Sequence, residues 1–123
     1  ELLRIARGDI QSALVLSRAN DGRPENCIYL AQQAVEKCLK AVLCFETQEI
    51  LLTHDIDSLI QTLGPANAPP DAHLLGSLSQ YASIRRYEEG YEEISQSDLE
   101  IITKLGDRIV AWAENKIAPK RTT

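Results

Sequence analysis

PENCIYLAQQAVEKCLKAVLCF, residues 24–45, is the most strongly periodic stretch of the chain. Its apolar residues recur every three or four positions, the spacing of one face of an α-helix. They are Cys27, Leu30, Ala31, Ala34, Val35, Cys38, Leu39 and Val42. Pro24 suits the first turn of a helix because its fixed φ angle fits there and no backbone N–H is needed. We therefore predict a long helix whose many small residues allow a neighbouring helix to approach closely.

Four further segments around this stretch have helical spacing. On the N-terminal side, residues 2–19 have apolar residues at helical intervals and end before Asn20-Asp21-Gly22, a typical helix stop. On the C-terminal side, Thr53 or Asp55 can cap a short helix that contains Ile56, Leu59, Ile60 and Leu63, with Gly64-Pro65 ending it. A proline-containing loop is expected to continue to about Asp71.

The last two segments complete the set. Residues 72–87 have an apolar stripe, and an acidic stretch interrupted by Gly90 follows. Ser97 and Glu100 have the spacing of a capping box, in which each side chain satisfies a backbone donor at the other end of the turn. A helix is expected from there to the polar residues 118–123, which we expect to form a flexible tail.

These patterns predict an all-α fold. The chain has 123 residues, of which 44% are hydrophobic and 25% charged, which suits one globular domain over residues 1–123. Short connections favour antiparallel neighbours, so we expect a single antiparallel bundle of four to five helices. No apolar run reaches the roughly 18 residues that span a bilayer, so no membrane association is expected.

Charge and cysteine content narrow the function classes. The net charge is −5, which argues against nonspecific phosphate binding over the whole surface but leaves room for a local basic site. Three cysteines, Cys27, Cys38 and Cys44, give no complete disulfide framework. We expect them to be reduced apolar fillers in a cytoplasmic protein. Their spacing does not suit a zinc site, and we expect no metal or cofactor.

The polar residues of the 24–45 helix are the first candidate site. Gln33 and Lys37 lie four residues apart and share a face, while Gln32, Glu36 and Lys40 form an adjacent row. Gln33, Lys37 and Lys40 could hold an anionic ligand. The alternative is a solvated face on which Glu36 and Lys40 form a weak ion pair.

A second candidate is Arg85-Arg86-Tyr87, at the end of the fourth predicted helix. Arginine presents a planar fork that can hold phosphate at two points, and tyrosine can stack on a base. The alternative is that the arginines neutralise the nearby acidic run. His54, at the start of the third helix, can orient polar groups or simply cap or pack. Metal binding by the acidic run is not expected, because nothing fixes its geometry.

The run from Tyr29 to Ala41, YLAQQAVEKCLKA, resembles the second-helix signature of HEPN domains, whose name stands for higher eukaryotes and prokaryotes nucleotide-binding. Three features agree in order: Asp9-x-x-x-Ala13, Thr53-His54-Asp55 and Arg86-Tyr87. The resemblance implies a bundle of four or five helices that commonly dimerises and associates with nucleotides or RNA. It also implies, in bacteria and archaea, a minimal nucleotidyltransferase as partner.

Some members of that family are toxins of toxin–antitoxin pairs, which cleave RNA with an arginine and a histidine that have four to six residues between them. Here neither Arg85 nor Arg86 is followed by histidine at that spacing, and Tyr91 stands where the histidine would follow Arg86. The resemblance thus implies a noncatalytic nucleotide- or RNA-binding module that uses the following candidates: Gln33, Lys37, Lys40, His54, Arg85, Arg86 and Tyr87. A ribonuclease with a degenerate site, in which Arg86 stabilises charge and Tyr91 or His54 moves protons, and a structural helical adaptor remain as alternatives.

Overall fold

A computed structural model of the chain describes residues 2–18, 24–47, 53, 55–75 and 96–117. Its helices are α1 (Leu2–Arg18), α2 (Pro24–Thr47), α3 (Ile56–Leu63), the 3₁₀ turn η1 (Pro65–Asn67) and α5 (Gln96–Ile117). Residues 72–75 are also helical and begin where the fourth helix was predicted. The all-α prediction is confirmed. The predicted tail and most of the fourth helix lie outside the described residues.

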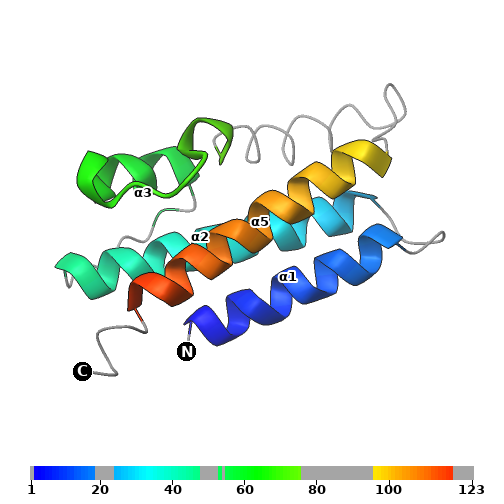
Figure 1. The fold of residues 1–123 in the computed structure, drawn as a ribbon, viewed down its shortest axis with the longest axis horizontal. Coiled ribbons are helices and arrows are strands. Elements are labelled where there is room, and N and C mark those ends of the chain that lie inside the picture. Colours follow the sequence, from blue (N-terminus) through cyan, green and yellow to red (C-terminus); the bar gives the residue numbers. More distant parts are fainter. Residues whose placement is uncertain (1, 19–23, 48–52, 54, 76–95, 118–123) are drawn as a thin grey trace.

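The three long helices lie side by side (Figure 1). α1 runs antiparallel to both α2 and α5, and all three helices contact one another. α3 packs against α2. Between residues 30 and 43 of α2 no residue is fully exposed, so α2 is the central helix of the described part of the chain.

The apolar stripes predicted from spacing form one hydrophobic core. Fully buried side chains come from α1, α2, α3 and α5, and they include Ile10, Val35, Leu39, Leu59 and Ile109. Small residues allow the close approach that the composition of residues 24–45 predicted. Two buried hydroxyls, those of Ser17 and Thr103, donate hydrogen bonds to carbonyls of the preceding turn of their own helices.

Helix ends agree with the predictions in part. Asp55 is the N-cap of α3, and Gly64, with a φ of 79°, ends it. The loop prediction after Gly64 was wrong for three residues, because Pro65 occupies the first turn of η1, where its fixed φ is favourable. α2 continues two residues beyond Phe45. Ser97 was predicted to cap α5, but the helix begins at Gln96, so Ser97 lies inside it.

Candidate functional site

Three of the predicted ligand-binding residues share one side of α2. Gln33, Lys37 and Lys40 follow one another at intervals of four and three residues, which aligns them along the helix. All three are partly buried. This row gives α2 a polar edge beside its apolar stripe. It is the part of the predicted site that lies within the described residues.

Lys37 is held by an acidic residue of another helix. Its Nζ atom lies 2.7 Å from Oδ2 of Asp9 in α1, and both side chains keep about a fifth of their surface in contact with solvent. The pair joins α1 to α2, the two helices with the most extensive contact, and it lies next to the buried stripe of α1. The ammonium group therefore already has an anionic partner.

Lys40 is held within its own helix. Its Nζ atom lies 3.2 Å from Oε2 of Glu36, one turn earlier, as the spacing predicted. However, the alternative of a solvated face was wrong for Glu36, whose side chain is only 5% exposed. Periodicity placed Glu36 beside the apolar stripe but could not show that neighbouring elements cover it.

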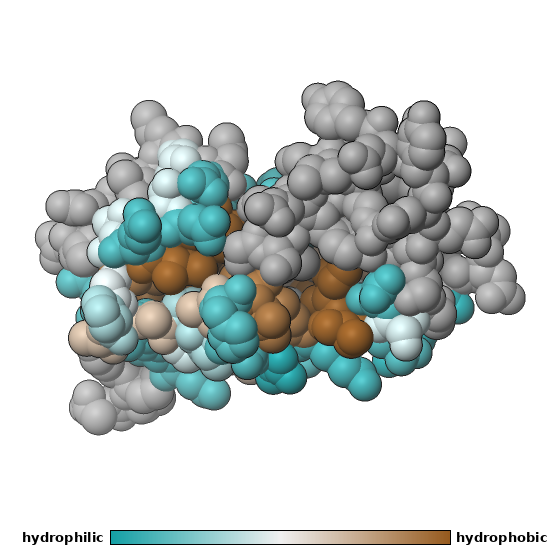
Figure 2. Space-filling view, turned by 90° about the horizontal axis from the view of Figure 1, so that it is seen from above, coloured by the Kyte–Doolittle hydropathy of each residue, from teal (hydrophilic) through white to brown (hydrophobic). Residues whose placement is uncertain are grey.

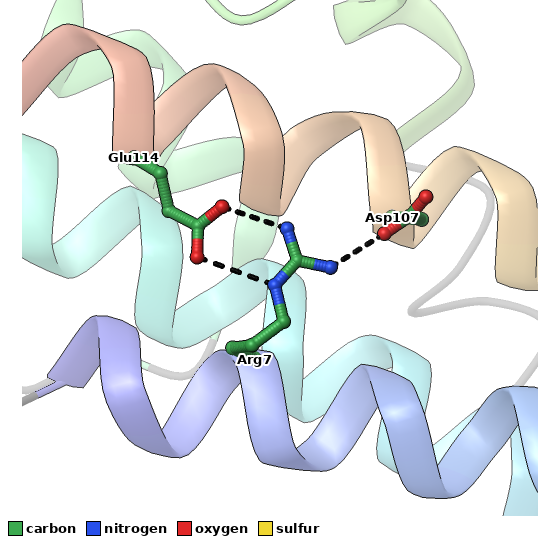
Figure 3. A network of polar contacts seen from close by, with 3 residues as sticks. All are labelled: Arg7, Asp107 and Glu114. Carbon is green, nitrogen blue, oxygen red and sulfur yellow. Dashed lines mark hydrogen bonds and ion pairs between the residues drawn. The ribbon is translucent and has the colours of Figure 1, made fainter.

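A third ionic cluster, which the sequence did not reveal, joins α1 to α5. The guanidinium of Arg7 donates two hydrogen bonds to the carboxylate of Glu114, at 3.2 and 2.7 Å, and one to Asp107 at 2.6 Å (Figure 3). The hydrogen bonds to Glu114, which have the strongest influence, and to Asp107 raise the pKa of Arg7. The guanidinium is already paired with two carboxylates, so we assign Arg7 a structural role. The available signal was the spacing of seven positions from Asp107 to Glu114, which places both carboxylates on one face of α5.

The remaining predicted residues, His54, Arg85, Arg86 and Tyr87, lie outside the described residues. Trp112 is partly buried and packs against the core, so much of its ring already serves the fold of one chain.

The cysteines have different surroundings. Cys27 and Cys38 are buried, as predicted, and burial raises their pKa values to about 11 and about 12. At Cys38 the neighbouring Glu114 raises the pKa further and Arg7 opposes it. The prediction of an apolar filler was wrong for Cys44, which is exposed. Across the described ranges, no group of three or more His, Cys, Asp or Glu side chains could hold a metal ion.

Apolar residues also reach the surface. Figure 2 shows them among hydrophilic residues on the face seen from above. Among the large hydrophobic residues of the described ranges, Val15 of α1 and Ile101 of α5 are the most exposed, at 68% and 62%. On α1, Val15 borders a shallow hollow with Gly8, Gln11, Ser12 and Leu16, and none of these side chains carries a charge that could hold a phosphate. In the part of the chain that the structure describes, no helix is both long and apolar enough to cross a membrane.

Comparison with known proteins adds one finding. A family model described as the HEPN domain matches residues 1–116, nearly the whole chain. Neither the curated proteins nor the solved structures that were searched gave a match. The matched range contains α1, α2, α3 and all but the last residue of α5.

Proposed function

Because the chain belongs to the HEPN domain family, we propose that it is a noncatalytic module that binds a nucleotide or RNA. One observation in the sequence carries the noncatalytic part. Both histidines, His54 and His73, precede Arg85 and Arg86, and the position that follows Arg86 after four residues is Tyr91. A phenol with a pKa of about 10 exchanges protons poorly near neutral pH, where an imidazole does so readily.

The proposed binding residues divide into two groups. Gln33, Lys37 and Lys40 form the polar row of α2, where the two ammonium groups can interact with phosphate oxygens. The second group, His54, Arg85, Arg86 and Tyr87, is proposed from the sequence alone. In this proposal the arginines bind phosphate, the tyrosine stacks on a base, and Gln33 and His54 orient polar groups.

The proposal includes two protein partners, a second copy of the chain and a minimal nucleotidyltransferase, in the cytoplasm. Both partners follow from what the family resemblance implies. The mass of the purified chain in solution, measured by light scattering, tests the first, and a monomer at high concentration would contradict it. Co-purification with a nucleotidyltransferase encoded beside the gene tests the second.

The deciding experiment measures RNA cleavage and RNA retention in the same samples, with wild type and Arg86→Ala. We expect wild type to retain labelled RNA without cutting it, and Arg86→Ala to retain less, since an arginine fork on phosphate is lost. Loss of one such contact weakens binding by about 1–3 kcal/mol, which is roughly 5- to 150-fold in Kd.

Other outcomes would identify a different function. Cleavage by wild type that Arg86→Ala abolishes would contradict the noncatalytic assignment and support the ribonuclease alternative. If wild type neither cleaves nor retains RNA, and binds no ATP or GTP at low salt, the nucleotide-binding proposal is wrong. A helical adaptor would then describe the chain better.

A further inference from the structure

The two lysines of the polar row have different ion-pair partners, Asp9 for Lys37 and Glu36 for Lys40. We propose that, because of this difference, Lys37 is the lysine that binds phosphate and Asp9 limits how tightly the phosphate is bound. In this mechanism a phosphate group of the ligand takes the place of Asp9 at the Lys37 ammonium. The inference rests on the proposed function, since it concerns the same ligand. It adds a residue on another helix that tunes how strongly the ligand binds.

The Lys37–Asp9 pair is suited to exchange. The distance of 2.7 Å is that of a full charge-assisted hydrogen bond, yet 23% of the lysine side chain and 21% of the aspartate side chain are exposed. When the pair opens, water can solvate the carboxylate that is left behind. Ion pairs that water can reach are weak, so a competing anion can displace one of the partners.

The Lys40–Glu36 pair is not suited to exchange. Here the carboxylate is only 5% exposed, and its oxygen accepts from Lys40 at 3.2 Å. Withdrawal of the ammonium towards a ligand would remove a cationic partner from a buried carboxylate, which is strongly unfavourable. Lys40 therefore stays paired with Glu36 and attracts phosphate only through its charge, whereas Lys37 can leave its partner, although the two lysine side chains are similarly exposed.

The charge of the whole chain suggests why it is useful that Asp9 holds Lys37 until a ligand binds. With a net charge of −5, the chain repels polyanions at long range, and a neutral Lys37–Asp9 pair offers them little attraction. A ligand is held only when its phosphate reaches the ammonium at short range while the rest of the ligand makes other contacts. The Lys37–Asp9 pair thus favours a ligand that makes several contacts over a small anion that offers only its charge.

The experiment compares two single substitutions that each remove one negative charge from a 2.7 Å ion pair. Asp9→Asn releases Lys37, and the matched control Asp71→Asn releases Arg108 of α5 in the same way. Lys37→Gln removes the proposed ligand itself. Circular dichroism establishes that each variant is folded. Binding is measured by fluorescence anisotropy with two probes, a labelled oligouridylate and a labelled ATP analogue, to distinguish RNA from a free nucleotide as the source of the phosphate.

We expect Asp9→Asn to lower the Kd of the bound probe about threefold, the size of an exposed ion-pair effect. Lys37→Gln should raise the Kd by a similar factor and reduce the salt dependence of RNA binding by about 0.7 in the log–log slope, the value for one phosphate contact on a single strand. Asp71→Asn should change the Kd less than twofold, because salt screens distant charges.

Three results would overturn the inference, and they are distinguishable. If wild type binds but Asp9→Asn and Asp71→Asn tighten binding equally, only the net charge matters and Asp9 has no special role. If Lys37→Gln binds as well as wild type, Lys37 is not the ligand. If no variant binds either probe, the proposed function itself is wrong, and the role of Asp9 falls with it.

Discussion

At the scale of the residue, Gly106 of α5 lies at a point where the three long helices meet. A Cβ atom built there would lie 2.6 Å from Cδ1 of Ile10 in α1 and 3.8 Å from Cβ of Ala31 in α2. Since Ile10 is fully buried, its methyl group has little room to move. Glycine inside a helix is destabilising by about 0.5–1 kcal/mol relative to alanine, so packing must outweigh this loss.

We predict that Gly106→Ala lowers the free energy of unfolding by about 1 kcal/mol, because overpacking by about 1–3 kcal/mol exceeds the gain in helix propensity. The matched control is Gly8→Ala in α1, where a Cβ meets nothing within 4 Å and the stability should rise by about 0.5–1 kcal/mol. Urea unfolding of both variants measures the difference.

Ile10→Val identifies the cause, since it removes the Cδ1 atom that the new methyl group meets. In the double variant we expect Gly106→Ala to be nearly neutral, which would appear as favourable coupling in a double-mutant cycle. A Gly106→Ala variant as stable as Gly8→Ala would show that the three helices separate freely at this point.

At the scale of the element, α3 depends on its first residues. It has only eight residues, too few to be stable alone, so its cap and its packing must hold it. The Asp55 carboxylate accepts from the Asp57 amide at 3.3 Å and from the Ser58 hydroxyl at 2.7 Å. Thr53 in turn accepts from the Asp55 amide at 3.0 Å.

We predict that Asp55→Ala lowers the free energy of unfolding by about 0.5–2 kcal/mol, the usual range for loss of an N-cap, while Asp55→Asn retains most of the stability because an amide oxygen can still accept. Thermal and urea unfolding provide the measurement. Equal losses for alanine and asparagine would indicate that the charge of Asp55 matters rather than its hydrogen bonds.

At the scale of the whole molecule, two buried thiols make the stability depend on pH. Burial raises the pKa of Cys27 from 9.0 to about 11 and that of Cys38 from 9.0 to about 12. Above pH 9 the unfolded chain loses these protons while the folded chain retains them. The free energy of unfolding should therefore be unaffected below pH 9 and fall above it, until the folded thiols also ionise.

The expected fall approaches 1.4 kcal/mol per pH unit for each thiol between about pH 9 and 11. Replacement of Cys27 and Cys38 by alanine should flatten this dependence, even though the cavities lower the absolute stability. Cys44→Ala serves as the control, because that thiol is exposed and its removal should leave the slope unchanged. Equal slopes for all variants would contradict the role of burial.

The fold was more predictable than the environment of the candidate site. Spacing predicted the bounds of α3 and the apolar stripe of α2, because helical periodicity determines which residues share a face. It could not predict that Lys37 meets Asp9, or that Arg7 meets Glu114, because those partners lie on different helices. The burial of Glu36 depends likewise on what covers α2, which no local pattern records.

The two ionic links of α1 also have a mechanical consequence. Arg7 and Asp9 are two residues apart and so project about 200° apart around the helix axis, one towards α5 and the other towards α2. Rotation of α1 about its axis in either direction would stretch one of the two ion pairs, so together they favour one rotational position of the helix. A ligand that releases Asp9 from Lys37 would leave the link to α5 and the buried side chains of α1 to hold the helix against rotation towards that side.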